Sequence, residues 1–140
     1  MEFVLNSLLD LDEMTRNILP KLRGGGVLLL EGEMGAGKTT FVKSLGNLLS
    51  VTDHISSPTF TLVHRYQACY DDRKFDIVHV DLYRIDKEDD ILCLDLDFQC
   101  PNNELLIIEW SERLKKLKPE RYFKMNFSYF GSDSRKVIIN

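Results

Sequence analysis

The sequence has 140 residues, of which 44% are hydrophobic and 29% are charged. This composition is typical of one soluble globular domain, here expected to span residues 1–140, and it excludes a disordered or collagen-like chain. The formal net charge of −4 argues against a nucleic-acid-binding module, which is expected to carry a basic face. Three cysteines without metal-ligand spacing and an N-terminus without signal-peptide features predict a cytoplasmic protein that does not associate with a membrane.

The first half of the chain predicts a helix, a buried strand and a second helix. Apolar residues at steps of three and four predict an amphipathic helix over Leu8–Leu22. Pro20 is expected to distort this helix or end it early, and Gly24–Gly26 to terminate it. Val27–Leu30 is apolar at every position, which favours a strand buried on both faces of a parallel sheet. A helix of about three turns follows, with its apolar face over Phe41–Leu49.

The second half of the chain contains mostly strand patterns. In chain order, the predicted elements are a polar loop over 50–58, a strand over 59–66, a turn over 71–74, a strand over 75–81, a short helix with a loop over 86–101, a strand over 105–109, a helix over 111–117 and a hairpin of strands 123–129 and 137–139. This order predicts an α/β protein with a P-loop NTPase-like three-layer fold. Its mixed sheet is expected to have a parallel centre and antiparallel edge strands.

The segment Gly32-Glu33-Met34-Gly35-Ala36-Gly37-Lys38-Thr39 fits the P-loop pattern at each fixed position. It also lies between an apolar strand and an amphipathic helix, which is the context that the motif requires. Glycines let successive backbone N–H groups curl around a phosphate, and the following helix adds its positive end. Lys38 supplies a charge to the β- and γ-phosphates, and the Thr39 hydroxyl suits Mg²⁺. The segment therefore predicts a Mg²⁺-dependent nucleoside triphosphate site.

Two strands end in a carboxylate that can serve this site. Glu109 ends the apolar run Leu105–Glu109, and Asp81 ends the run Val78–Asp81. Ligands of open α/β sheets bind at the carboxyl ends of the strands, so both side chains are expected near the phosphates. Glu109 is the first candidate for the metal, and Asp81 is the first candidate for orienting the attacking water. The residues alone leave these two roles interchangeable.

Several other residues have a functional and a structural interpretation. The hydroxyl-rich loop Ser56–Thr61 is comparable to loops that sense a γ-phosphate, although its threonines also suit a plain strand. His79, inside an apolar strand, is typical of a hydrogen-bonded core histidine. Trp110 is a candidate for stacking on a base or for packing. Arg84 and Arg135 are candidates for neutralising phosphate charge, or for ordinary solvated arginines.

With these residues placed, the sequence resembles the TsaE family of small P-loop ATPases needed for threonylcarbamoyladenosine biosynthesis in bacterial tRNA. Four blocks carry the resemblance, in the order and spacing of the family. They are the segment from Gly32 to Phe41, Ser57-Pro58-Thr59-Phe60-Thr61-Leu62-Val63, His79-Val80-Asp81-Leu82-Tyr83-Arg84 and Ile108-Glu109-Trp110. Where the family often carries a threonine before its first helix, an ungapped alignment puts Leu11.

The resemblance implies an ATPase with ATP and Mg²⁺ as cofactors and with TsaD-like and TsaB-like proteins as partners, so that tRNA is involved only indirectly. It implies that Thr39 and Glu109 bind the metal, and that Asp81, Lys38 and Glu109 serve hydrolysis. The loop Ser57–Thr61 would be a switch. The expected nucleotide-binding residues are Gly32, Gly35, Ala36, Gly37, Lys38, Thr39, Thr40, Thr61 and Trp110.

Two other functions use many of the same residues. A small nucleoside or nucleotide kinase needs an acceptor pocket and usually arginines from a lid, and the sequence contains no arginine-rich lid segment. A non-catalytic nucleotide sensor would use the same P-loop and switch loop, so the sequence does not distinguish it from an ATPase. No arginine is placed as a finger over the phosphates, which predicts slow hydrolysis without a partner.

Overall fold

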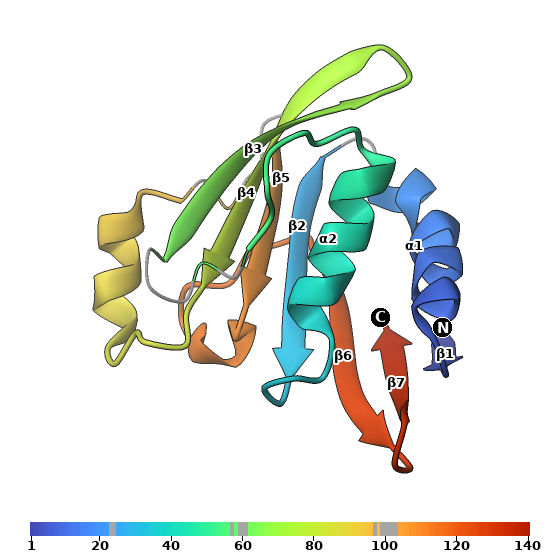
Figure 1. Ribbon diagram of the computed structural model, residues 1–140. Coiled ribbons are helices and arrows are strands. Elements are labelled where there is room, and N and C mark those ends of the chain that lie inside the picture. The colour runs from blue at the N-terminus through green and yellow to red at the C-terminus, as the bar shows by residue number, and fades with distance from the viewer. Residues whose placement is uncertain (23–24, 57, 59–61, 97, 99–103) are drawn as a thin grey trace.

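A computed structural model of the protein describes residues 1–22, 25–56, 58, 62–96, 98 and 104–140. Its strands are β1 (Glu2–Leu5), β2 (Gly26–Gly32), β3 (Val63–Tyr70), β4 (Arg73–Asp81), β5 (Glu104–Glu109), β6 (Phe123–Phe130) and β7 (Ser134–Ile139). Its helices are α1 (Leu8–Leu22), α2 (Lys38–Leu48) and the 3₁₀ helices η1 (Glu88–Leu94) and η2 (Ser111–Arg113). The strands form a seven-stranded sheet in the order β1-β7-β6-β2-β5-β4-β3 (Figure 1).

The centre of the sheet is parallel and its edges are antiparallel. β2 pairs in parallel with β5 on one side and β6 on the other, and β5 pairs in parallel with β4. β3 is antiparallel to β4, β7 is antiparallel to β6, and β1 is antiparallel to β7. This arrangement confirms the predicted α/β fold with a mixed sheet. It also confirms that the all-apolar run Val27–Leu30 lies in a central strand.

Side chains of β2 alternate between two hydrophobic cores on the two faces of the sheet. Leu28 and Leu30 pack under α1 and α2, which cover the same face (Figure 1). Val27 and Leu29 belong to the opposite core, together with Ile91 of η1. The third layer of the fold is therefore thin and is built from 3₁₀ turns and loops. Within the described part of the chain, no helix combines the length and the apolar character needed to cross a membrane.

Two features near the N-terminus differ from the prediction. Pro20 does not end its helix early, because α1 continues to Leu22. A proline this close to the end sacrifices one backbone hydrogen bond, and burial of Leu19 and Leu22 offsets that loss. The short edge strand β1 was not predicted. Its four residues have no strong alternation, and they are strand only because they pair with β7 from the other end of the chain.

The hairpin of β3 and β4 is longer than predicted, and its turn is shorter. β3 begins at Val63, after Leu62 adopts a left-handed backbone with φ 66°, and it continues to Tyr70. Residues 59–61, where the predicted strand began, lie outside the described residues. The turn consists of Asp71 and Asp72 alone, with φ angles of 51° and 60°. A positive φ at both residues is what the common type I′ hairpin turn requires.

The predicted helix over Ser111–Leu117 is wrong beyond its first turn. Only η2 forms, and Trp110 just before it has a left-handed backbone with φ 58°. The backbone N–H groups of Lys115, Lys116 and Leu117 donate to one oxygen of the Glu88 side chain, at 2.9, 2.6 and 2.6 Å. These three groups are thereby unavailable for helix hydrogen bonds, and the carboxylate ties η1 to the segment after η2.

The Glu88 contact predicts a pH-dependent contribution to stability. Bonding to the N–H of Leu117 and of its two neighbours lowers the pKa of Glu88 below its usual value. The stabilisation is therefore full above the pKa of the unfolded state, about 4.3 for a glutamate, and is lost as pH falls through the lower folded pKa. Urea unfolding should find Glu88→Gln less stable than wild type at pH 7, with the difference shrinking at acid pH. Asp89→Asn, an exposed neighbour, is the control, and a Glu88→Gln deficit that stays constant with pH would contradict the prediction.

Candidate functional site

The glycine loop connects β2 to α2 at the carboxyl end of the parallel strands. Gly35 and Gly37 have φ of 79° and 110°, values that side chains rarely adopt, so the loop can curl only with glycine at these positions. Gly37 is the N-cap of α2, and no described side chain caps the helix; its first turn also contains no acidic residue. The first N–H groups of α2 and its positive dipole end are therefore left for a ligand, which suits an anion.

Lys38 lies at the start of α2 and is only 5% exposed. Its Nζ donates to the carbonyl oxygen of Gly32 at 2.6 Å and lies 3.9 Å from the ring centroid of Trp110. Trp110 also contacts Tyr83, and their ring centroids are 5.0 Å apart. Burial lowers the pKa of Lys38, and the nearby Glu109 carboxylate opposes that shift. The ammonium is thus held at the mouth of the loop by one carbonyl and one aromatic face.

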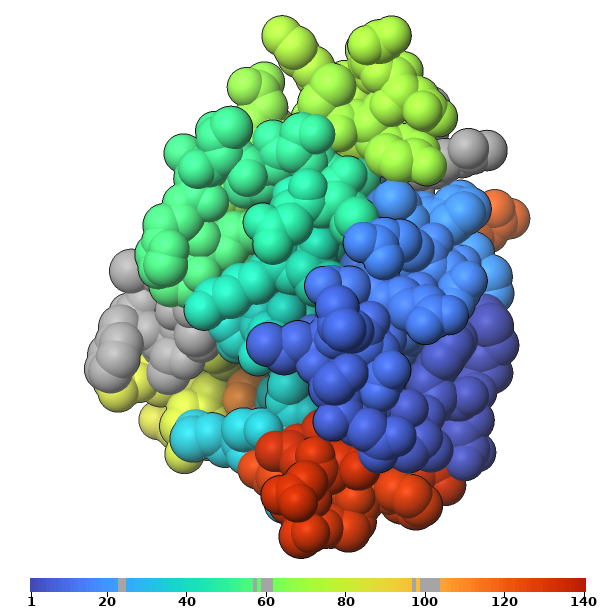
Figure 2. Space-filling view, turned by 45° about the vertical axis from the view of Figure 1, so that its right-hand side comes forward, coloured from blue at the N-terminus to red at the C-terminus, as the bar shows by residue number. Residues whose placement is uncertain are grey.

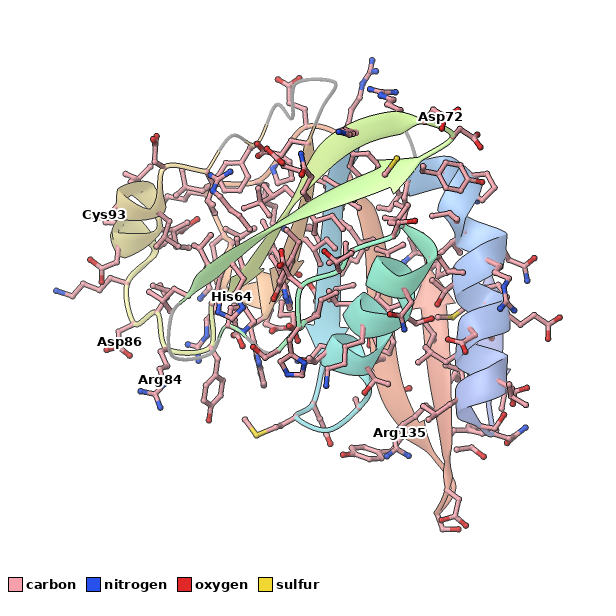
Figure 3. All side chains as sticks on the ribbon, turned by 45° about the horizontal axis from the view of Figure 1, so that its top comes forward. His64, Asp72, Arg84, Asp86, Cys93 and Arg135 are labelled. Atoms are coloured by element: carbon pink, nitrogen blue, oxygen red, sulfur yellow. The ribbon has the colours of Figure 1, made fainter. Side chains whose placement is uncertain are left out.

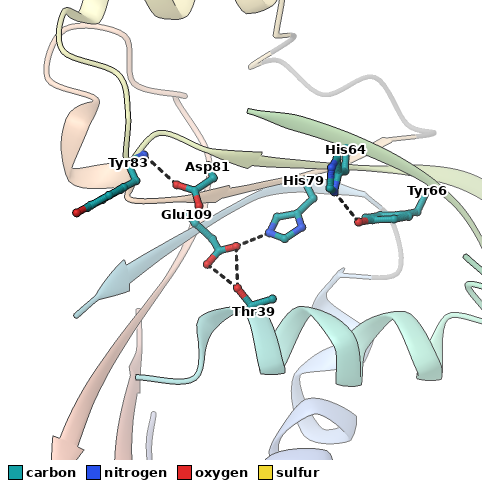
Figure 4. Close-up of polar contacts among 7 residues, drawn as sticks. All are labelled: Thr39, His64, Tyr66, His79, Asp81, Tyr83 and Glu109. Atoms are coloured by element: carbon teal, nitrogen blue, oxygen red, sulfur yellow. Dashed lines mark hydrogen bonds and ion pairs between the residues drawn. The ribbon is translucent and has the colours of Figure 1, made fainter. Parts of the chain in front are cut away.

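The two predicted carboxylates lie side by side at the ends of β4 and β5. Asp81 and Glu109 are direct register partners, and their exposed fractions are 2% and 3%. The Thr39 hydroxyl lies 3.3 Å from Oε1 and 3.4 Å from Oε2 of Glu109, across the gap from α2 to β5 (Figure 4). Asp81 Oδ1 accepts the backbone N–H of Tyr83 at 2.8 Å. The glycine loop, the hydroxyl and both acids therefore share one edge of the sheet.

His79 contacts the same cluster from near the carboxyl end of β4. Its Nε2 lies 2.5 Å from Oε2 of Glu109, and its side chain is fully buried (Figure 4). The interpretation of His79 as a buried, hydrogen-bonded histidine is confirmed. The sequence alone did not identify its partner, because the contact joins two strands whose pairing is not visible from residue spacing.

A pocket of about 290 Å³ lies on the other side of the glycine loop. The N-terminal segment, the start of α2 and the C-terminal hairpin meet there (Figure 2). Its polar lining includes Asn6, Ser7, Thr40 and Arg135. Arg135 points toward the loop end of the molecule, far from Asp72 at the tip of the β3–β4 hairpin (Figure 3). Leu11 also lines this pocket, although it lies inside α1 and not before it.

The remaining predicted residues do not share one location. Gly35, Ala36 and Gly37 line the pocket as well as forming the loop. Trp110 is not among the pocket residues, and its ring faces Lys38 instead. Arg84 is exposed. Thr61, and with it Ser57, Thr59 and Phe60 of the predicted switch loop, lies outside the described residues.

Tyr129 is a loop-supporting residue that the sequence did not reveal. Its hydroxyl donates to the carbonyl oxygen of Met34 at 2.9 Å, and its ring lies 4.2 Å from the guanidinium carbon of Arg135. A Cβ on Gly35 would approach the same hydroxyl to 2.8 Å. The only sequence signal at Tyr129 is apolar alternation, which indicates a strand but not the neighbour of that strand.

The fold and this edge of the sheet define a P-loop-like α/β protein. Its sequence matches the family described as "Threonylcarbamoyl adenosine biosynthesis protein TsaE" over residues 5–137. The chain belongs to the TsaE family, whose members take part in the biosynthesis of threonylcarbamoyladenosine in tRNA. The resemblance found from the four sequence blocks is therefore confirmed.

Individual relatives support the same assignment. The chain is 40% identical over 122 residues to the tRNA threonylcarbamoyladenosine biosynthesis protein TsaE of Nostoc sp., covering 84% of this chain and 72% of that protein. It is 31% identical over 137 residues to the protein of that name from Rickettsia prowazekii, covering 97% and 92%. The crystal structure of YdiB from Bacillus subtilis superposes with a TM-score of 0.75 at 25% identity, covering 98% of this chain and 82% of YdiB.

The close approach of β6 to the start of the glycine loop predicts that Gly32 tolerates no side chain. Gly32 has φ 137°, and a Cβ there would collide with the backbone carbonyl of Phe127. Strain and overpacking together should make Gly32→Ala less stable by about 3 kcal/mol in urea unfolding. Gly131→Ala is the matched control, since Gly131 has φ 69° with no atom within 4 Å of the added Cβ, and strain alone costs about 1 kcal/mol there. Equal losses in the two variants would contradict the role of the collision.

Proposed function

We propose that this protein is a Mg²⁺-dependent ATP-binding subunit and ATPase of the threonylcarbamoyladenosine machinery, and that it acts with TsaD-like and TsaB-like partners. One observation carries the biochemical part of the proposal. The Thr39 hydroxyl and the Glu109 carboxylate lie 3.3–3.4 Å apart, next to Lys38 and the uncapped start of α2. A hydroxyl, a buried carboxylate, an ammonium and a row of free amides are together the groups that a metal-bound triphosphate requires.

The phosphate chain would be bound by the backbone of Gly35, Ala36 and Gly37 and by the first turn of α2. The glycine conformations already curl the loop. The Ala36 N–H, which donates to the Glu33 carbonyl at 3.1 Å in this structure, would have to turn from that carbonyl to a phosphate. Lys38 would leave the Gly32 carbonyl and place its charge on the β- and γ-phosphates. Its low exposure keeps water from competing for the ammonium.

The donor set beside the phosphates fits Mg²⁺. Thr39 and Glu109 offer hard oxygen atoms, which this cation prefers, and leave room for phosphate oxygens and water as further ligands. A bound Mg²⁺ would neutralise charge on the phosphates. The contact with Thr39 favours Glu109 over Asp81 as the metal-side carboxylate. Asp81, level with Glu109 in the neighbouring strand, is then the residue that orients the attacking water.

The nucleoside would occupy the pocket behind the loop. The pocket continues directly from Gly35 and Gly37, and about 290 Å³ is close to the usual lower size for a small-molecule site. Ser7 lies just before α1, so it is the better counterpart of the threonine found there in the family, and Leu11 supplies apolar surface. Trp110 would act on the phosphate side through its contact with Lys38 rather than by stacking on the base.

Hydrolysis by the protein alone is expected to be slow. Arg135 lines the pocket proposed for the nucleoside, and Arg84 is exposed. We therefore assign neither residue as an arginine finger over the γ-phosphate. A partner protein would complete the charge neutralisation and couple turnover to the cytoplasmic tRNA-modifying complex. The contact with tRNA would then be indirect, in keeping with the net charge of −4.

Substitutions at Lys38 and Asp81 should separate binding from hydrolysis. Calorimetry with MgATP should find Lys38→Ala at least about tenfold weaker, because a buried ammonium that meets the phosphates is lost. Asp81→Asn should bind within about threefold of wild type but hydrolyse at least about 100-fold more slowly in single turnover, the usual loss for a group that handles the attacking water. Absence of binding heat for ATP with folded wild-type protein would remove the basis of the proposal.

The assignment as a partner-dependent ATPase can be tested against the kinase and sensor alternatives. Added TsaD-like and TsaB-like proteins should copurify with this chain in the presence of ATP. They should also raise its rate of ATP hydrolysis by at least about tenfold, because they add charged contacts to the phosphates. Transfer of phosphate to any nucleoside in a panel would indicate a kinase. ATP-dependent copurification without any turnover would indicate a sensor.

A further inference from the structure

Glu109 has a neighbour that the proposed metal site does not itself require. The Nε2 atom of His79 lies 2.5 Å from Oε2 of Glu109, and the Thr39 hydroxyl lies 3.3 Å from Oε1 and 3.4 Å from Oε2. A carboxylate has no hydrogen to donate, so the hydrogen of this bond is on Nε2 and His79 is the donor. The imidazole contacts Oε2 alone, whereas the hydroxyl of the P-loop helix lies about equally close to both oxygens of Glu109.

The strand pairing fixes where this donor sits. His79 is the register partner of Ile107, two residues before Glu109 in β5, so the hydrogen bond runs diagonally between adjacent strands on one face. On the other side of β4, His79 is paired with His64, whose Nδ1 contacts the Tyr66 hydroxyl at 3.0 Å (Figure 4). With 0% of its surface exposed, the ring of His79 has no room to swing away from the carboxylate.

Packing alone does not account for a histidine at this position. Nδ1 of His79 is buried and has no hydrogen-bond partner among the described residues. A buried polar atom without a partner costs free energy, and an apolar side chain of similar size would avoid that cost. The polar contact that compensates for it is the one with Glu109. The histidine is thus explained by what it does to the carboxylate.

We infer that His79 is a positioning residue for divalent-cation binding: it holds Oε2 of Glu109 and so fixes the carboxylate beside Thr39 and the phosphate edge. This inference rests on the proposed Mg²⁺–nucleotide function. Groups that hydrogen-bond a metal-binding side chain from behind restrict its orientation, and their loss typically weakens metal binding by about 10–100-fold. His79 would touch neither the metal nor the nucleotide.

The test measures the Mg²⁺ concentration that gives half-maximal binding of a fluorescent ATP analogue. His79→Leu removes the donor but keeps apolar volume, and it should raise that concentration by at least about tenfold. Binding of the analogue in EDTA should stay within about twofold of wild type, because the loop amides and Lys38 remain. Val78→Ala is the matched control: it removes buried volume from the same strand but in the opposite core, and it should leave the Mg²⁺ requirement unchanged.

A pair of amide variants makes the test independent of the leucine variant's folding. Glutamine places its N–H₂ about where Nε2 lies and can still donate to Glu109, whereas asparagine is too short to reach it. His79→Gln should therefore need less Mg²⁺ than His79→Asn, which a purely structural role would not produce. Equal requirements in these two variants, or a wild-type requirement in folded His79→Leu, would overturn the inference. If binding to the wild type itself is independent of Mg²⁺, the metal part of the proposed function is wrong instead.

Discussion

The site depends on two buried carboxylates held side by side at the ends of parallel strands. Asp81 and Glu109 are register partners and almost completely shielded from solvent, so their negative charges cannot be solvated by bulk water. Burial of this kind is tolerated only where opposite charges or donors surround the groups. Lys38, Thr39 and His79 provide them, and the positive end of α2 faces the same edge. A cation between the acids and a polyphosphate would balance the arrangement further.

The rest of the fold keeps this charged edge rigid. β2, which leads into the glycine loop, contributes alternate side chains to two separate cores, so it is fixed from both faces. α2 is packed on one of them through Phe41 and Leu45, both fully buried. The loop itself is tied to the C-terminal hairpin by Tyr129. The distance between the loop amides and the carboxylates is therefore set by well-packed elements and not by the loop alone.

Local sequence patterns predicted the parts whose determinants are local. The all-apolar run 27–30 lies in a central strand, as predicted. The glycine loop and the two acids lie together because strand direction alone brings the carboxyl ends of parallel strands together. The missed features depend on partners distant in sequence. β1 needs β7, the chain after η2 does not continue as a helix because Glu88 binds its amides, and His79 meets Glu109 only through the pairing of β4 with β5. Residue spacing contains no information about such pairs.

The position of Lys38 links the glycine loop to the surface around Tyr83. In this structure the ammonium is bound by the Gly32 carbonyl and the face of Trp110, and Trp110 in turn packs on the partly exposed ring of Tyr83. A polyphosphate bound as proposed would compete for the same ammonium with far more charge than a carbonyl and a ring can offer. Transfer of Lys38 to a phosphate would remove the cation from the tryptophan face and change what supports Tyr83. Binding of a phosphate in the glycine loop would then change the surroundings of Trp110 and Tyr83 without any movement of the sheet.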